Sequence, residues 1–232
     1  TNPKIKIKEK RMKNVAVILA RGGSKNIPNK NIISVCNRPL IYYTIRAAIM
    51  SEVEETWIST DSDQIAEIAY EYGAKILIRP AEYAEDTSSS ELALIHFCQN
   101  IEAENVVFVQ PTSPLVSFKD INVGLKMLNS YDSVFSGCKE HWVPRWEIIS
   151  DIYLKEYHWT KKSRPRRQDK QELIIENGAF YASPSKLILK SGLRYSGNIG
   201  VVEMPPSRSF QVDTYDDLLI VEALLKANPW NK

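Results

Sequence analysis

A glycine-containing loop with two cations directly follows the first apolar run of the chain. Residues 15–18 read Val-Ala-Val-Ile, and the loop after them contains Arg21, Gly22, Gly23, Ser24 and Lys25. Paired glycines let backbone N–H groups turn toward an anion, and arginine and lysine supply positive charge for a polyphosphate. The loop is neither a Walker motif nor a three-glycine dinucleotide fingerprint. By itself, a Gly-Gly loop is more often an ordinary tight turn with solvated charges.

Five short motifs, spread along the chain in a fixed order, change this interpretation. They are ARGGSKNIPNKN (20–31), STDSD (59–63), RPAE (79–82) with DTSS (86–89), QPTSP (110–114), and RQD (167–169) with NGAFY (177–181). Together they resemble the acylneuraminate cytidylyltransferases, also called CMP-sialic acid synthetases, from about residue 14 to about residue 225. Five motifs in one order are not expected by chance.

The resemblance implies transfer of CMP from CTP to the anomeric hydroxyl of a sialic acid, a nine-carbon sugar acid, with release of pyrophosphate. Such a reaction needs an electrophilic α-phosphate, neutralised pyrophosphate charge and a hydroxyl held in line. The matched nucleotide-binding residues are Arg21, Gly22, Gly23, Ser24, Lys25, Lys30, Asn31, Arg79 and Ser90. The matched sugar-binding residues are Gln110, Arg167, Gln168, Asn177 and Tyr181, and the expected catalytic residues are Arg21, Lys30 and Asp213.

Several of these residues also have a structural interpretation. Asn31 has the donor and acceptor that a pyrimidine edge requires, whereas Ser90 can equally be the N-cap of the following helix. Taken alone, Arg79 reads as a solvated arginine at a strand end, and Tyr181 reads as a core aromatic. The basic run 161–167 suits the carboxylate of a sugar acid, but it also resembles a nuclear-import signal.

The expected metal site departs from the family pattern. Most members carry Asp-x-Asp near the C-terminus to bind Mg²⁺ with the substrate phosphates, and here the sequence is Gln211-Val212-Asp213. Because Mg²⁺ is often held by one or two carboxylates plus phosphates and water, Asp213 alone can serve as the protein ligand. The loss of one negative charge leaves the metal affinity and the number of metals open.

Bulk properties exclude several classes of protein. The 232 residues include 30 Lys and Arg against 28 Asp and Glu, so no global field indicates a nucleic-acid partner. No stretch of about 20 apolar residues predicts a membrane span. The three cysteines share no metal-like spacing, which favours free thiols and a cytoplasmic location, with a nuclear one as the alternative. Residues 1–12 are expected to form a disordered leader, followed by one domain over residues 13–232.

The elements that must position these residues follow an α/β pattern. Near-continuous apolar strands alternating with one-sided helices predict a mostly parallel sheet with helices on both faces, and the resemblance implies the Rossmann-like fold of nucleotide-diphospho-sugar transferases. Ligands of such sheets bind outside the carboxyl ends of the strands, where the glycine loop and the 110–114 loop both lie. The predicted strands are 15–19, 56–59, 75–78, 106–109, 133–135, 178–182 and 199–203; the predicted helices are 40–50, 62–72, 90–100, 121–130, a short one after residue 184, and 216–226.

The alternation breaks between about residues 138 and 176. This segment is rich in tryptophan and tyrosine and is expected to form the interface of a homodimer. Two questions remain open at this point. The preferred acceptor is a sialic acid, or else legionaminic, pseudaminic or another 2-keto sugar acid. The substitution at Gln211 also allows a weakened homologue that only binds nucleotide.

Overall fold

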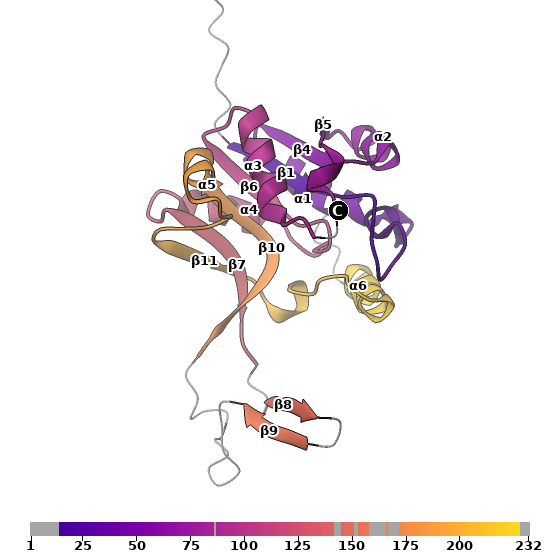
Figure 1. The fold of residues 1–232 in the computed structure, drawn as a ribbon, viewed down its shortest axis with the longest axis vertical. Helices are drawn as coiled ribbons and strands as arrows, with labels where there is room; N and C mark the ends of the chain where they lie inside the picture. Colours follow the sequence, from indigo (N-terminus) through magenta and orange to yellow (C-terminus); the bar gives the residue numbers. More distant parts are fainter. Residues whose placement is uncertain are drawn as a thin grey trace, which may run out of the picture.

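A seven-stranded sheet in the order β11-β7-β10-β6-β1-β4-β5 forms the centre of the computed structural model (Figure 1). The structure describes residues 14–85, 87–141, 145–150, 153–157, 166 and 172–227. β1 pairs in parallel with β4 and β6, β4 with β5, and β7 with β11, whereas β10 runs antiparallel to β6 and β7. The prediction of a mostly parallel sheet is therefore confirmed. The strands are β1 (Asn14–Leu19), β4 (Glu55–Thr60), β5 (Lys75–Ile78), β6 (Asn105–Val109), β7 (Ser133–Lys139), β10 (Ile174–Pro184) and β11 (Ile199–Glu203).

Helices cover both faces of this sheet, as predicted. One core cluster packs α1 (Leu40–Ile49), α2 (Asp63–Glu71) and α4 (Phe118–Met127) against Ala16 and Ile18 of β1. The opposite cluster packs α3 (Ser90–Asn100) and α5 (Ser185–Ser191) against Val15 and Val17. Alternate residues of one strand thus enter two cores, which is why the strand is apolar throughout. A third cluster holds α6 (Tyr215–Ala227) against the start of α1.

Capping explains where α4 begins. The sequence predicts a helix over residues 121–130, but α4 starts three residues earlier. The Ser117 hydroxyl accepts from the Lys119 N–H at 3.3 Å, and the Asp120 carboxylate accepts from the Ser117 N–H at 2.9 Å. This reciprocal capping box satisfies N–H groups that the first turn leaves unpaired, and so it fixes the helix start. Ser62 likewise caps α2, and Ile65 donates to its hydroxyl at 3.4 Å.

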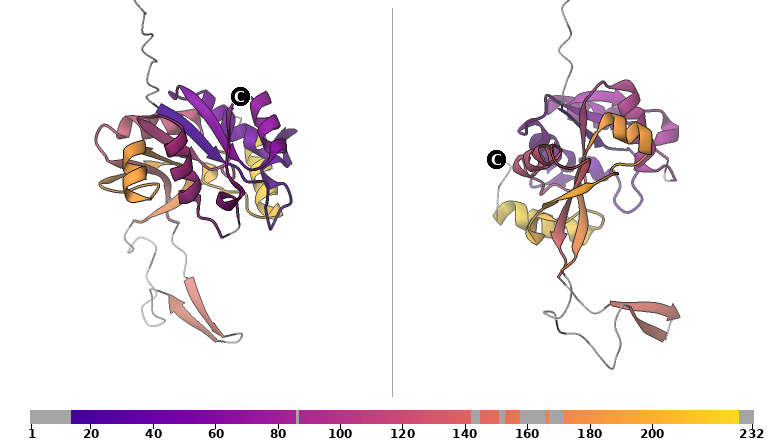
Figure 2. Two further views of the ribbon diagram at one scale, coloured as in Figure 1. Left: turned by 45° about the horizontal axis from the view of Figure 1, so that its top comes forward. Right: turned by 90° about the vertical axis from the view of Figure 1, so that its left-hand side faces the viewer.

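Sequence periodicity does not reveal the hairpin of β8 (Arg145–Ser150) and β9 (Tyr153–Tyr157). β7 and β10 extend beyond the sheet as a two-stranded ribbon, in which Lys139 still pairs with Ile174. Figures 1 and 2 show the β8–β9 hairpin beyond the end of this ribbon, away from the sheet. The insertion that the sequence predicts at residues 138–176 therefore begins and ends within this ribbon, because it includes the pairs of Lys139 with Ile174 and of Cys138 with Ile175.

Smaller elements complete the fold. A short hairpin joins β2 (Ser34–Val35) to β3 (Arg38–Pro39), and the 3-10 turns are η1 (Lys30–Ile32), η2 (Ala81–Tyr83) and η5 (Pro206–Arg208). Cys36, Cys98 and Cys138 are free thiols, as expected. Within the described residues, every helix is too short or too polar to cross a membrane. The leader expected at residues 1–12 lies outside the described residues.

Candidate active site

The glycine loop after β1 is held against the turn that follows β4. The Gly22 N–H donates to Asp61 Oδ1 at 3.0 Å. A Cβ added at Gly22 would lie 3.1 Å from the Cβ of Ser62, closer than an ordinary contact, whereas one at Gly23 would meet nothing within 4 Å. The two glycines therefore differ in role. Gly22 packs so closely against Ser62 that a side chain there would force a small shift, whereas Gly23 leaves exposed backbone beside the ligand space.

A cavity of about 360 Å³ opens where β1, β5 and β6 end. Five segments that are distant in sequence form its wall: the loop after β1, the end of β5, the segment leading into α3, the end of β6 with its loop, and the segment before α6. The lining residues are Leu19, Arg21, Gly23, Ser24, Lys30, Asn31, Arg79, Tyr83, Glu85, Ser88, Ser89, Ser90, Phe108, Gln110, Pro111, Thr112, Gln211 and Asp213. The site thus lies at the carboxyl ends of parallel strands, where the sequence predicts it.

Arg79 is the most deeply buried of the three cations that line the cavity. Its side chain belongs to a residue only 5% exposed, and its Nε has no hydrogen-bond partner in the described part of the chain. Burial lowers the pKa of Arg79, nearby Asp61 opposes this, and Arg21 lowers it further. Arginine nevertheless stays protonated at neutral pH. A buried cation with an unused donor favours an anionic ligand, and the interpretation of Arg79 as a solvated strand-end residue is wrong.

The other two cations of the lining make contacts with segments distant in sequence. Lys30 Nζ is 2.9 Å from Asp213 Oδ1, with Lys30 largely covered and Asp213 more than half exposed. Arg21 Nη1 lies 3.5 Å from the carbonyl oxygen of Ala84, in the segment after η2. Together with Arg79, these side chains place positive charge around one space, as binding of a polyphosphate requires.

Asn31 both borders the cavity and holds the loop. It is 7% exposed, and its Nδ2 donates to the carbonyl oxygen of Arg21 at 2.9 Å. Asn29, at φ 52°, makes the turn that brings Lys30 and Asn31 back toward the loop. The Asn31 Nδ2 group therefore already donates one hydrogen bond to the glycine loop before any ligand binds.

Three other predicted nucleotide residues separate into two groups. Ser90 lines the cavity, and the N-cap of α3 is Ser89, whose hydroxyl accepts from the Leu92 N–H at 3.4 Å. The interpretation of Ser90 as the cap is therefore wrong. Gly22 and Lys25 are not part of the lining: Gly22 supports the loop, and Lys25 is exposed.

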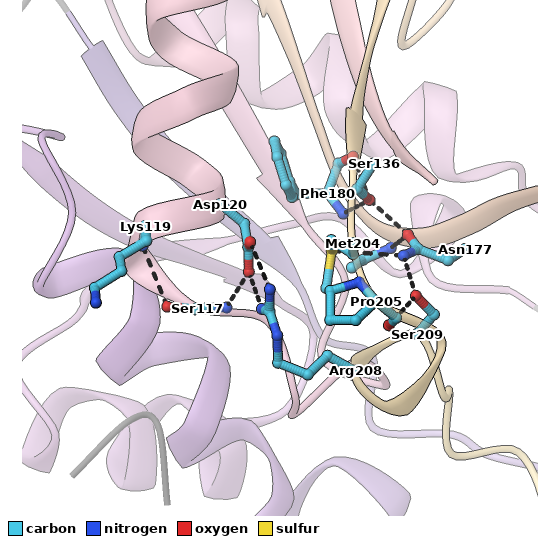
Figure 3. Close-up of polar contacts among 11 residues, drawn as sticks. Ser117, Lys119, Asp120, Ser136, Asn177, Phe180, Met204, Pro205, Arg208 and Ser209 are labelled. Carbon is cyan, nitrogen blue, oxygen red and sulfur yellow. Dashed lines mark hydrogen bonds and ion pairs between the residues drawn. The ribbon is translucent and has the colours of Figure 1, made fainter. Parts of the chain in front are cut away.

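The segment from residue 204 to 213 brings Gln211 and Asp213 to the cavity, and it is fixed at several points. Both oxygens of the Asp120 carboxylate pair with the Arg208 guanidinium, with 2.9 Å between Nη2 and Oδ1. Figure 3 shows this pair beside the α4 capping box. An ion pair with two hydrogen bonds is directional as well as strong, so it fixes the position of η5 relative to the N-terminus of α4.

Asn177 fixes the same segment from the side of β10 (Figure 3). Its Nδ2 donates to Ser209 Oγ at 2.9 Å, and its Oδ1 accepts from Ser136 Oγ at 2.7 Å and from the Ala179 N–H at 3.1 Å. The residue is buried and is not part of the cavity lining. The structure therefore places Asn177 in the scaffold that carries Gln211, whereas the sequence predicts a sugar contact.

Tyr181 does not line the cavity, and the ring of Phe108 lies between it and the cavity. It stacks on Phe108, which lines the cavity, at 5.7 Å between centroids, and on Tyr195 at 5.8 Å. Its hydroxyl donates to Glu176, and Arg194 lies 4.9 Å from its ring. Burial, together with the Glu176 carboxylate, raises the pKa of Tyr181. The structure thus supports the interpretation as a core aromatic.

The remaining predicted sugar residues have different outcomes. Gln110 lines the cavity, and Gln211 Nε2 donates to its Oε1 at 2.9 Å. Arg167 and Gln168 lie outside the described residues. Sequence reasoning missed Tyr83, Glu85 and Ser88 as lining residues, although the first two lie between the motifs at 79–82 and 86–89 and Ser88 lies within the second.

The residues present fit a metal ion only together with a ligand. No group of three or more His, Cys, Asp or Glu side chains is arranged to hold a metal within the described residues. Asp213 and Glu85 supply the carboxylates of the cavity lining. One carboxylate beside a polyphosphate suits Mg²⁺, which usually keeps waters and phosphate oxygens as ligands. Asp213 fits that role.

Comparison with known proteins gives consistent results. The sequence model of the Cytidylyltransferase family matches residues 15–190. The chain is 38% identical over 213 residues to N-acylneuraminate cytidylyltransferase B of Danio rerio, covering 89% of this chain and 50% of that protein. It is 31% identical over 231 residues to pseudaminic acid cytidylyltransferase of Campylobacter jejuni, covering 94% of this chain and 98% of that protein. The chain thus spans about half the length of the first relative and nearly all of the second.

Solved structures share the fold at lower identity. A CMP:2-keto-3-deoxy-manno-octonic acid synthetase complexed with CTP superposes with a TM-score of 0.70 at 20% identity, covering 93% of this chain and 99% of that one. A 4-diphosphocytidyl-2C-methyl-D-erythritol synthase from Anaerococcus prevotii gives 0.67 at 18% identity, covering 93% and 96%. These similarities concern the arrangement of the main chain.

Proposed function

The chain belongs to the cytidylyltransferase family, and we propose that it transfers CMP from CTP to the anomeric hydroxyl of a sialic acid, releasing pyrophosphate. The observation that carries this proposal is the convergence of Arg21, Lys30 and Arg79 on one cavity beside the glycine loop. Arg79 contributes a buried Nε that has no hydrogen-bond partner among the described residues. The similarity to an N-acylneuraminate cytidylyltransferase supports the choice of acceptor.

In this reaction the anomeric hydroxyl loses its proton to solvent and its oxygen forms a bond to the α-phosphorus. The bond from that phosphorus to the oxygen that bridges it to the β-phosphorus breaks, and pyrophosphate leaves. Negative charge accumulates on the equatorial oxygens and on the leaving pyrophosphate. Arg21, Lys30 and Arg79 supply fixed positive charge near this developing negative charge. Because the three side chains are already in place, they stabilise the transition state without having to reorient. Gln110, which also lines the cavity, holds the sugar acid so that its hydroxyl lies in line.

We propose Mg²⁺ as the cofactor, held by Asp213 together with phosphate oxygens and water. When bound, it supplies positive charge to the phosphates. Because Asp213 already pairs with Lys30, binding of CTP and metal must redistribute this ion pair.

We also propose a homodimer formed through the β8–β9 hairpin. Both faces of this two-stranded sheet carry exposed apolar side chains: Ile148 is 76% exposed, Ile149 52% and Leu154 49%. A large apolar surface on an isolated hairpin is typical of an interaction site, and an isologous contact between identical hairpins is the usual solution for a homodimer.

The test is release of pyrophosphate from CTP with a panel of 2-keto sugar acids. We expect turnover with N-acetylneuraminic acid, and strong preference for CTP over ATP and GTP because Asn31 and its loop match a pyrimidine site. Equal rates with ATP would contradict the nucleotide assignment. Binding of CTP without turnover of any sugar acid would instead indicate the weakened homologue that Gln211 suggests.

Pseudaminic acid is the second candidate acceptor. The similarity to the Campylobacter jejuni enzyme covers 98% of that protein, whereas the vertebrate relative is matched over half its length. The same panel of sugar acids decides between the two acceptors, because it compares kcat/KM for both with the same enzyme preparation. A kcat/KM for pseudaminic acid at least ten times that for N-acetylneuraminic acid would favour this alternative.

A further inference from the structure

The side chains of Gln110 and Gln211 form a direct amide–amide hydrogen bond at the cavity wall. Gln211 Nε2 donates to Gln110 Oε1 at 2.9 Å, and it also lies 3.5 Å from Ser113 Oγ. Both glutamines line the cavity. The resemblance leads us to expect a carboxylate at position 211, and here a neutral amide makes this contact instead.

The backbone beside this pair leaves no room for a side chain at position 178. Gly178 adopts φ +66°, and a Cβ there would lie 2.1 Å from Gln211 Nε2 and 3.1 Å from Gln110 Oε1. Val212, next to Gln211, donates its N–H to the Thr112 carbonyl at 2.8 Å. The amide pair is therefore seated between two segments whose register is fixed, and any side chain at position 178 would displace it.

The direction of this bond determines what Gln110 offers to a ligand. An amide has one acceptor oxygen and one donor nitrogen, and the Gln211 donor occupies the oxygen side of Gln110. The Nε2 of Gln110 makes no hydrogen bond within the described part of the chain. We propose that Gln211 is a positioning residue that keeps the donor end of Gln110 available for an acceptor oxygen of the sugar acid. This inference rests on the proposed function, since it concerns the sugar end of the same cavity.

A carboxylate at position 211 would have the opposite effect. Ionised Glu has no proton to donate, so it would attract Gln110 Nε2 and turn the amide around. Gln110 would then present its oxygen to a substrate that is itself anionic and rich in acceptor oxygens. The neutral amide at 211 is thus matched to a substrate group that accepts hydrogen bonds.

The experiment is a double-mutant cycle of Gln211→Met and Gln110→Met, with Gln211→Glu as a third variant of similar length. For the parent and each variant, KM is measured separately for sugar acid and for CTP, together with the Mg²⁺ concentration at half-maximal rate. We expect Gln211→Met to raise the KM for sugar acid about 3- to 10-fold, the effect of losing one well-placed hydrogen bond, with the KM for CTP unchanged. In the Gln110→Met background the same change should have little effect, because the positioned group is gone.

Gln211→Glu should raise the KM for sugar acid more than Gln211→Met does, because it reverses Gln110 and adds a negative charge. Unchanged KM for sugar acid in Gln211→Glu would overturn the proposed bond direction. Full additivity of the two methionine substitutions would overturn the coupling. Equal increases in both KM values would indicate a general structural role and would also overturn the proposal. A parent that binds CTP but turns over no sugar acid contradicts the proposed function instead.

If a variant is unstable, thermal melting will reveal it. CTP affinity measured by calorimetry then supplies a second readout: it should match the parent for a positioning residue of the sugar site. Reduced CTP affinity in a folded Gln211→Met protein would place Gln211 at the nucleotide and contradict the inference.

Discussion

Lys30 Nζ and Asp213 Oδ1 lie 2.9 Å apart, although 183 positions separate the two residues in the chain. The contact joins the loop after β1 to the segment before α6 across the cavity. Asp217 holds the far end of this contact, because its Oδ2 accepts from the N–H groups of Asp213 at 3.0 Å and Thr214 at 2.8 Å. A bound polyphosphate would therefore meet a cation and an anion that are already paired.

Asp213→Asn should nearly abolish turnover. The amide keeps the size of the side chain but removes the charge that pairs with Lys30 and that the proposed Mg²⁺ would need. We therefore expect kcat to fall about 100-fold or more, as for other groups acting on transition-state charge. Pyrophosphate release measures this. Asp216→Asn is the matched control, because Asp216 is exposed and is not part of the cavity lining. An Asp213→Asn enzyme within about twofold of the parent would contradict both roles of the carboxylate.

Arg21→Ala should lower kcat by about 100-fold or more, because removal of one preorganised group that stabilises transition-state charge commonly has this effect. Arg38→Ala is the control, since Arg38 is an exposed arginine whose guanidinium lies 5.3 Å from the Tyr42 ring, away from the cavity lining. Steady-state rates with saturating CTP separate kcat from KM. Loss of CTP affinity with unchanged kcat would mean that Arg21 binds substrate and transition state equally.

Glu91→Gln should destabilise the fold at neutral pH but much less in acid. Glu91 accepts from Arg194 Nε at 2.6 Å. Burial alone would raise the pKa of Glu91, but the bond and charge of Arg194 outweigh this and hold it below the ordinary value. A lowered carboxyl pKa gives stability that is present above the unfolded pKa, about 4.5, and is lost as pH falls through the folded pKa.

Thermal melts of the parent and of Glu91→Gln at pH 7 and pH 3.5 test this expectation. The difference in Tm should be larger at pH 7. Glu67→Gln provides the comparison, because Glu67 is exposed on α2. A Tm difference that is the same at both pH values would show that the variant disturbs packing and that the charge of Glu91 contributes nothing.

Replacing apolar residues of the β8–β9 hairpin should separate the proposed dimer. Ile148 and Leu154 are cross-strand partners, and both are exposed. Ile148→Asp with Leu154→Asp places charges on this surface, so we expect a monomer by sedimentation at micromolar concentration while the parent is a dimer. Tyr70→Asp is a control, because Tyr70 is 74% exposed on α2, on the main body. A parent that sediments as a fully active monomer would contradict the proposal.

Most of the sheet and its helices could be predicted from the sequence because each element carries its own periodic pattern. The predicted ranges of β5, β11 and α3 coincide with the observed ones. The hairpin of β8 and β9 could not be found this way, since all of β8 and most of the described side chains of β9 are exposed, and neither strand alternates regularly. The periodicity of apolar residues shows which side chains are buried, and few side chains of this hairpin are buried.

Only some of the residues that line the cavity could be predicted from the sequence. Arg21, Lys30, Arg79 and Gln110 follow strands or lie in distinctive motifs, so their place at one edge follows from the topology. Asn177 carries the same kind of motif, yet its amide is bonded to Ser136 and Ser209, which lie 41 and 32 positions away. Which polar residues bond to each other and which remain for a ligand depends on such distant pairs. Sequence motifs do not encode that distinction.

Gln211→Asp should lower the Mg²⁺ concentration needed for half-maximal rate. Gln211 lines the cavity with Asp213, and a carboxylate there adds a charged oxygen ligand where the amide offers a neutral one. The same change removes the donor that positions Gln110, so the KM for sugar acid should rise while the metal requirement falls. Opposite movements of these two quantities are expected only if position 211 borders both the metal and the sugar.

The measurement is a titration of rate against Mg²⁺ for the parent and for Gln211→Asp, at saturating CTP and sugar acid. Gln211→Asn is the matched control, because it shortens the side chain equally without adding charge. We expect Gln211→Asn to leave the Mg²⁺ curve in place, so that any shift in Gln211→Asp arises from the carboxylate. Identical Mg²⁺ curves for all three proteins would mean that one protein carboxylate, Asp213, is sufficient in this chain. Gln211 would then serve the sugar site alone.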